Sequence, residues 1–177
     1  MPNASRKALS PPVDDLALIS RRYVETAIAY SRESPRRRVI QPFHRTAADA
    51  LHRMLNAMQP DSYVRPHRHR DPPKAEAWIV LHGALAFFTF DEQGAVRECV
   101  RLSADGDAFG VDLVPGVYHG LLALEADTVL YEVKTGPYRE ADDKAFAPWA
   151  PEEGSPDAPA YMQQLLAIYA ERSTRAR

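Results

Sequence analysis

Three histidines and one glutamate stand at spacings that suit a divalent transition metal. His67 and His69 are separated by one residue, Glu76 follows them, and His119 comes after a Pro-Gly turn. Imidazole nitrogens and carboxylate oxygens are donors for Fe(II), Mn(II), Ni(II), Co(II) and Zn(II), and the residues do not choose among these ions. Four protein ligands on an octahedral ion leave two positions for water or substrate, as a catalytic centre requires. The sequence therefore predicts one divalent metal site.

Short strands have to position these side chains. Residues two apart on a strand leave the same face, so His67 and His69 are expected to project together. Runs rich in Val, Leu, Phe and Tyr, separated by turn residues, predict about eight strands, at residues 51–58, 63–67, 76–81, 85–91, 96–102, 109–114, 120–124 and 129–134. Many short strands at nearly regular spacing are typical of a β-sandwich or barrel.

The same residues resemble the two motifs of the cupin superfamily. The first motif, His-x-His followed by Glu and Gly, is matched by His67, His69, Glu76 and Gly83. The second, Gly followed by a Pro-Gly turn and His, is matched by Gly110, Pro115-Gly116 and His119. The gap from Arg70 to Ala75 is longer than is usual in the family. The resemblance implies an all-β, single-domain cupin, a double-stranded β-helix or jelly-roll barrel, with His67, His69, Glu76 and His119 as ligands of one metal.

A narrower similarity covers more of the chain. Segments 53–57, 63–69, 132–138 and 146–154 resemble the WbuC-type cupin-fold metalloproteins of bacteria, in a likeness that runs roughly from Pro35 to Gly154. It implies a metal-binding single cupin associated with polysaccharide or O-antigen gene clusters. No reaction follows from it.

Composition narrows the class of partner. The chain has 177 residues, is 45% hydrophobic and carries a formal charge of −2, so neither nucleic acid nor a membrane surface is expected to bind it. Cys99 is the only cysteine, so an internal disulfide is impossible. The first residues lack the apolar core of a signal peptide, and no apolar run has the length of a membrane span. We therefore expect a cytoplasmic protein with a small-molecule ligand. By analogy with other cupins we expect a homodimer.

Two helices are expected to flank the barrel. Apolar residues recur at three- and four-residue spacing near both ends of the chain: Leu16, Ile19, Tyr23, Ala27 and Tyr30, then Tyr161, Leu165, Ile168 and Tyr169. The predicted organisation is a disordered tail over 1–12, a helix over 13–34, a cupin barrel with a proline-rich C-terminal strap over 35–154, and a helix with its tail over 155–177.

Strand parity adds candidate ligand-binding residues. If the strand is continuous from Tyr63 to His69, Tyr63 and Arg65 face the same way as the histidines, and Arg65 can hold a carboxylate or phosphate. Alternatively, the proline at position 66 breaks the alternation and Arg65 reaches solvent. Trp78 shares a face of its strand with Glu76, the candidate metal ligand. Glu132 and Lys134 also share a face, which is either interior or an exposed ion pair.

Three functions are compatible with these residues. The first is a metal-dependent isomerase or epimerase that acts on a small anionic or sugar-like metabolite, a reaction type in which the metal acts as a Lewis acid. The second is an Fe(II)-dependent oxygenase, since these donors suit that ion. The third is a non-catalytic metabolite- or sugar-binding protein.

Overall fold

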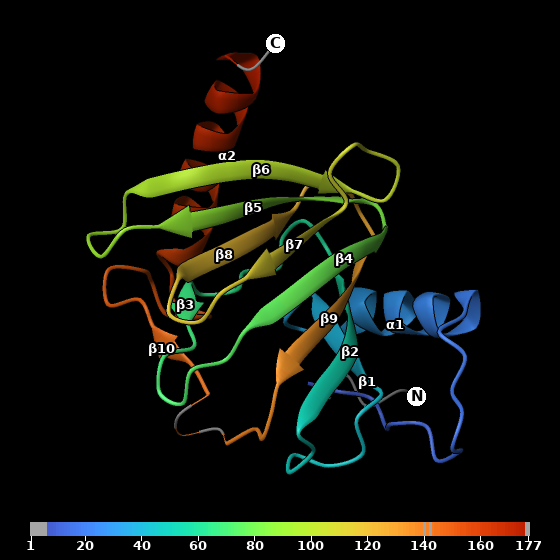
Figure 1. Ribbon diagram of the computed structural model, residues 1–177. Coiled ribbons are helices and arrows are strands. Elements are labelled where there is room, and N and C mark those ends of the chain that lie inside the picture. Colours follow the sequence, from blue (N-terminus) through green and yellow to red (C-terminus); the bar gives the residue numbers. More distant parts are fainter. Residues whose placement is uncertain (1–6, 140, 142, 176–177) are drawn as a thin grey trace.

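The computed structural model describes residues 7–139, 141 and 143–175. Its helices are α1 (Arg21–Glu33) and α2 (Ala158–Arg175), and its strands are β1 (Arg38–Pro42), β2 (Leu51–Met58), β3 (His67–Arg68), β4 (Glu76–His82), β5 (Ala84–Phe90), β6 (Val96–Ser103), β7 (Gly110–Leu113), β8 (Tyr118–Ala123), β9 (Thr128–Thr135) and β10 (Ala145–Phe146). Figure 1 shows the strands as two facing sheets. Within this described part, neither helix is both long and apolar enough to cross a membrane.

The strand order defines the fold. One five-stranded sheet runs β1-β2-β9-β4-β7 and the other runs β10-β3-β8-β5-β6, and all neighbouring strands in both are antiparallel. Without the outermost β1 and β10, the eight remaining strands form the two Greek keys of a jelly roll. This confirms the predicted fold class, a mostly β jelly-roll barrel with flanking helices.

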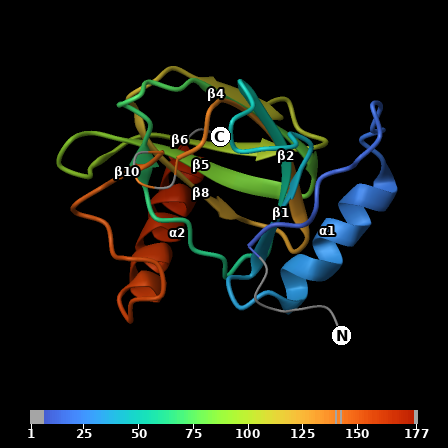
Figure 2. The ribbon, with the colours of Figure 1, turned by 90° about the horizontal axis from the view of Figure 1, so that it is seen from below.

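Alternation along the strands separates three apolar clusters. On β5, Leu85 and Phe87 point between the sheets, whereas Ala86 and Phe88 point outward. The outward residues pack beneath α2, and a third cluster around Leu55 packs beneath α1. Seen from below, the helices lie on opposite sides of the barrel (Figure 2). The helices thus cover parts of the outer faces of both sheets. The candidate site lies between the sheets.

The N-terminal region departs from the prediction. The helix begins at Arg21, after Ser20, and not at residue 13. Val13, Leu16 and Leu18 are exposed and have no core to pack against, so the apolar spacing did not produce a helix there. The predicted disordered tail is also wrong for its described part, because Ala8 forms a parallel bridge with Ile40 on β1. Residues 1–6 of that tail lie outside the described residues.

The predicted strand over 63–67 is wrong for most of its length. The strand β3 contains only His67 and Arg68. Pro66 has no N–H to donate to a sheet, and the backbone carbonyl of Tyr63 accepts a hydrogen bond from the Arg38 side chain (2.7 Å) instead of from a strand. The other seven predicted strands appear with ends shifted by a few residues at most, and β2 matches its predicted range.

Candidate metal centre

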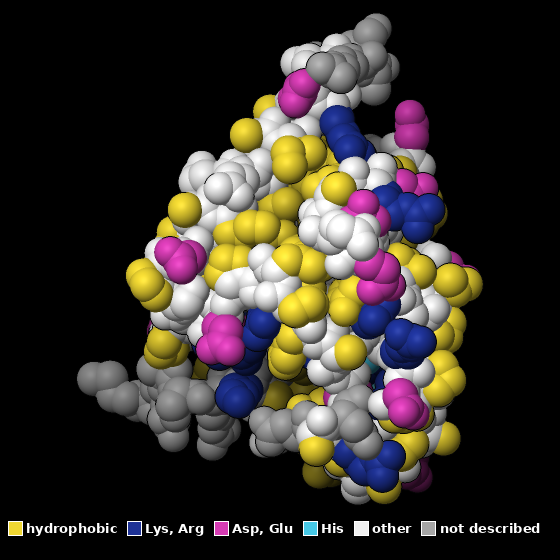
Figure 3. Space-filling model, turned by 90° about the vertical axis from the view of Figure 1, so that its left-hand side faces the viewer, with side chains coloured by type: hydrophobic (Ala, Val, Ile, Leu, Met, Phe, Trp, Pro, Cys, Tyr) yellow, Lys and Arg dark blue, Asp and Glu magenta, His cyan; other side chains and the backbone are white. Residues whose placement is uncertain are grey.

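Two neighbouring strands and one turn bring the three histidines together. His67 on β3 and His119 on β8 are direct cross-strand partners. His69 lies just beyond β3, and its backbone carbonyl accepts a hydrogen bond from the Gly116 N–H (2.9 Å), which ties it to the turn before His119. All three side chains are buried, and one ring nitrogen from each lies within 4.8 Å of the others. Almost no histidine side chain is visible on the face of the molecule that Figure 3 shows.

Backbone carbonyls hold each imidazole ring by its Nδ1 atom. The partners are the carbonyls of Arg65 for His67 (2.9 Å), of Val117 for His119 (3.0 Å) and of Asp143 for His69. A carbonyl oxygen can only accept, so each Nδ1 carries the proton. In the neutral ring the Nε2 atom then has a free lone pair, as in metal-binding histidines, whose second nitrogen usually donates to a carbonyl or carboxylate.

Glu76 faces two of these lone pairs from the opposite sheet. Its Oε1 lies 3.1 Å from His69 Nε2 and its Oε2 lies 3.2 Å from His119 Nε2. Neither contact is a hydrogen bond: both Nε2 atoms and Oε2 are buried without a hydrogen-bond partner. Two ligands about 2.1 Å from one ion are about 3 Å apart when their bonds are perpendicular. These donors therefore fit a shared cation, and the three-histidine cluster points to a divalent metal.

Electrostatics keep these groups in the states that a cation needs. Burial lowers the pKa of His67 well below its usual value, and the nearby Lys144 charge lowers it further, so the ring is neutral. Burial by itself would raise the pKa of Glu76, but the rings of His119 and His69 outweigh it and hold that pKa below its usual value. The pocket thus presents a neutral imidazole at His67 and an ionised carboxylate at Glu76.

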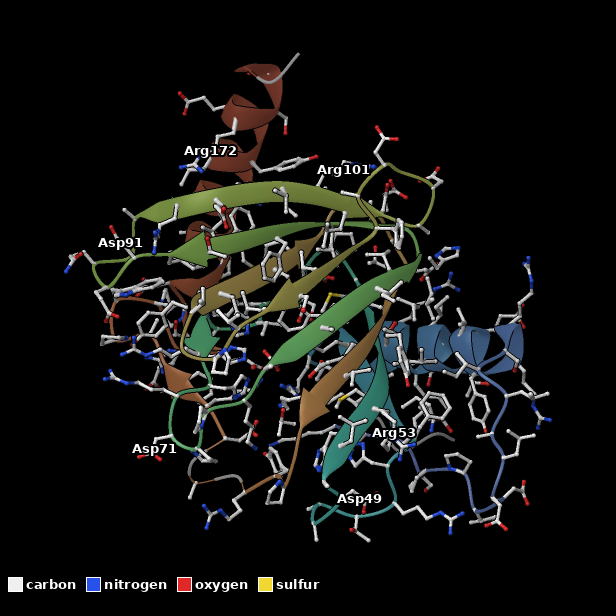
Figure 4. The ribbon with its side chains drawn as sticks, viewed as in Figure 1. Asp49, Arg53, Asp71, Asp91, Arg101 and Arg172 are labelled. Carbon is white, nitrogen blue, oxygen red and sulfur yellow. The ribbon has the colours of Figure 1, made fainter. Side chains whose placement is uncertain are left out.

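A buried ion network behind the histidines was not predicted from the sequence. Asp143 accepts from Lys74 Nζ (2.7 Å) and Lys134 Nζ (3.0 Å), and its backbone carbonyl is the one that holds His69. Lys74 comes from the lengthened gap between the first two histidines and Glu76. Asp71 in the same gap lies at the outer bend of the loop (Figure 4). The length of the gap was the one signal in the sequence that extra residues approach the site here.

Three of the predicted ligand-binding residues do lie between the sheets. The Trp78 ring is 5.3 Å from that of His119, centroid to centroid, and forms an aromatic wall beside the site. Lys134 Nζ is 3.8 Å from Glu76 Oε1 and 3.9 Å from Glu132 Oε1, while Glu132 Oε2 accepts from Asn56 (2.8 Å). Burial alone would lower the pKa of Lys134, but three surrounding carboxylates raise it. Of the two alternatives for this pair, the interior one holds.

Tyr63 and Arg65 are not brought to the histidines in the same way. Because the chain before His67 is irregular, Tyr63 packs beneath α2, where its hydroxyl donates to the Pro151 carbonyl (2.9 Å). Arg65 donates to the Ala147 carbonyl (3.0 Å) and lies 5.2 Å from the centroid of Phe146, both on the strap. The premise of a continuous strand from Tyr63 to His69 is therefore wrong, and Arg65 is held by the strap.

Comparisons with known proteins give distant matches. The family model described as "Domain of unknown function (DUF6016)" matches residues 19–102, less than half of the chain. No curated protein matches it.

Among solved structures, oxalate decarboxylase from Bacillus subtilis is 21% identical over 54% of this chain, with a TM-score of 0.43. KdgF from Halomonas sp. is 21% identical over 59% of this chain and 82% of its own, with a TM-score of 0.44. Oxalate decarboxylase from Lactobacillus farciminis, in a formate complex, is 18% identical over 56% of this chain, with a TM-score of 0.43. This chain spans only 23% and 28% of the two decarboxylase chains. Its activity therefore has to be inferred from its own residues.

Proposed function

We propose that this chain is a cupin metalloprotein that holds one divalent transition metal at His67, His69, Glu76 and His119. We further propose that it acts there on a small anionic or sugar-like metabolite. One observation carries the proposal: the anchored imidazoles of His69 and His119 turn buried Nε2 atoms without a hydrogen-bond partner toward the Glu76 carboxylate, at 3.1 and 3.2 Å. Unpaired acceptors in a buried site are costly unless a cation satisfies them.

Isomerisation or epimerisation is the reaction type that the surrounding residues support best. A bound metal supplies Lewis acidity toward a carbonyl or hydroxyl oxygen. Lys134 has a raised pKa, so it stays charged and stabilises negative charge that develops on a ligand. Glu132, 3.9 Å from Lys134, is the carboxylate available to accept a proton. Trp78 closes one wall against water.

The charges around the site favour an anionic ligand. Glu76, Glu132 and Asp143 are matched by Lys74, Lys134 and Lys144, so these six side chains sum to zero. A divalent cation makes the sum positive. An anion restores the balance in a region where burial makes net charge costly.

Metal content tests the site directly. Wild-type protein purified without chelator or a histidine tag is expected to contain one transition metal per chain. The variants His67→Ala and His119→Ala are expected to lose it while keeping a folded barrel by circular dichroism. His82→Ala is the matched control, because His82 is exposed and its Nδ1 contacts only the Asp127 carbonyl (3.0 Å). Full metal content in both site variants would refute the assignment.

A substrate panel separates the three functional classes. Sugars, sugar nucleotides and hydroxy acids are included, because the WbuC-type resemblance implies surface polysaccharide metabolism. Conversion without oxygen supports the isomerase or epimerase. Iron-dependent oxygen uptake with a panel member supports the Fe(II)-dependent oxygenase, whose metal suits the same donors. Calorimetric binding without turnover supports the non-catalytic binding protein.

A homodimer is the assembly that we propose. The N-terminal segment has an irregular backbone and leaves Val13, Leu16 and Leu18 exposed, and Ile79 and Leu81 are exposed on the outer face of β4. A second copy of the chain would cover such apolar side chains. One chain has a mass of 19.8 kDa, and light scattering is expected to give twice that mass. A single-chain mass at micromolar concentration would contradict this proposal.

A further inference from the structure

The strap places Lys144 beside the histidines. On β10, Phe146 pairs with His67 and Ala145 pairs with Arg68, in antiparallel register. The same register continued by one residue puts Lys144 opposite His69. Side chains two apart share a face, so Lys144 follows Phe146, whose ring centroid is 6.1 Å from that of His67. Lys144 therefore belongs to the face of the strap that meets the metal site.

Lys144 differs from the other two lysines of this region in its partners. Lys74 and Lys134 are buried, and Asp143 accepts a hydrogen bond from both. Lys144 is exposed and makes no ion pair within 4.0 Å among the described residues. Among these three lysines, Lys144 is thus the one whose ammonium group remains available to a ligand.

The electrostatic surroundings of Lys144 agree with this position. Although part of the Lys144 side chain is exposed, the protein atoms around its ammonium group lower its pKa, the Lys134 charge lowers it further, and the charges of Glu132 and Glu76 raise it. The group that shifts the pKa of His67 most, after burial, is Lys144 itself. These couplings agree with the strand register, which places Lys144 close to the site.

We propose that Lys144 binds the oxyanion of a ligand held at the histidine cluster. The ligand class is a small molecule that carries a carboxylate or phosphate next to the oxygen that meets the metal. Lysine binds such groups as a point charge, without the fork geometry of arginine. A dication and an ammonium group that lie side by side repel each other, and one anion that contacts both relieves the repulsion. This inference rests on the proposed metal site.

Anion binding to the Co(II)-loaded protein tests the inference without any turnover assay. Glycolate and inorganic phosphate are titrated separately and followed by calorimetry and by the visible absorption of Co(II), so that carboxylate and phosphate are distinguished. Glycolamide is the neutral match for glycolate. The variants are Lys144→Gln, Lys144→Arg and, as an equal change of charge at an exposed position beside β1, Lys7→Gln.

We expect at least one of the two anions to bind the wild-type protein about 10-fold more tightly than it binds Lys144→Gln, a difference typical of a charged hydrogen bond. Lys144→Arg and Lys7→Gln are expected to stay within about 3-fold of wild type, and glycolamide to be insensitive to all three changes. If Lys144→Gln keeps full Co(II) and its anion affinities equal those of wild type, or if neither anion binds, the inference is overturned and the metal site stands. If wild-type protein takes up no stoichiometric Co(II), the proposed function fails, and the inference fails with it.

Discussion

Asp143→Asn is the substitution that best tests the buried network behind the three-histidine cluster. The side chains of Asp143 and Lys74 are only 2% and 1% exposed, and Lys134 is 7% exposed. Asparagine keeps the volume and removes the charge. Two buried ammonium groups then lose their shared carboxylate at once, which is a more severe loss than at a surface pair.

The expected magnitude follows from the partners that remain. Breaking a buried ion pair by removing one member costs about 3–5 kcal/mol. Lys74 still donates to the Pro137 carbonyl (2.5 Å), and Lys134 keeps Glu76 at 3.8 Å and Glu132 at 3.9 Å. We therefore expect a loss near the lower end, about 3 kcal/mol in the free energy of unfolding.

The dependence on pH has a definite sign. The Lys134 and Lys74 ammonium groups hold the pKa of Asp143 below its usual value, although burial opposes them. A carboxylate with a lowered folded pKa adds stability that is present above its unfolded pKa and is lost as pH falls through the folded one. The difference between wild type and Asp143→Asn should thus be constant near neutral pH and shrink below about pH 3.8.

Urea denaturation of metal-free protein is the assay, because a bound metal would add its own stabilisation. Asp61→Asn is the matched control: Asp61 pairs with Arg37 at 3.0 Å but is 65% exposed, so its loss should cost at most about 1 kcal/mol. In a double-mutant cycle with Lys74→Met, the double variant should lose at least about 1 kcal/mol less than the sum of the single losses. A loss below about 1 kcal/mol for Asp143→Asn, together with additivity in the cycle, would refute the network as a source of stability.

Three further outcomes are expected. Saturating metal at 100 times its Kd should raise the unfolding free energy of wild type by about 2.7 kcal/mol but leave that of His119→Ala unchanged, and equal shifts in urea titrations would contradict the site. Phe88→Ala empties a fully buried position beneath α2 and should lower the free energy of unfolding by about 3–5 kcal/mol. Phe109 is 54% exposed, so Phe109→Ala should lower it by less than about 1 kcal/mol. Similar losses for the two variants would contradict the assigned packing. Gly136→Ala would place a Cβ in steric overlap with the Asp49 carbonyl oxygen and should lower stability by about 1–3 kcal/mol in thermal or urea unfolding. An unchanged midpoint would show that the two segments are not in contact.

Sequence patterns predicted the strands where the local signal and the tertiary contacts agree. The run from Leu51 to Met58 is a strand over the predicted range, because both of its neighbours accept the same alternation. The strand predicted from Tyr63 was wrong for most of its length. Pro66 has no N–H to donate to a neighbouring strand, and the Tyr63 carbonyl accepts its hydrogen bond from the side chain of Arg38. The prediction that the first helix begins at residue 13 was also wrong. The helix begins at Arg21, because the apolar side chains before it have no core to pack against.

The sequence by itself determined the types and the order of the candidate donors, with a Pro-Gly turn before the third histidine. It also determined that sheets would dominate. Only the tertiary structure decided that Asp143 supplies the carbonyl for His69 and the carboxylate for Lys74 and Lys134, and that β10 pairs with β3 beside the cluster. Local spacing specifies the face on which a side chain lies, whereas which segments meet depends on how the whole chain closes.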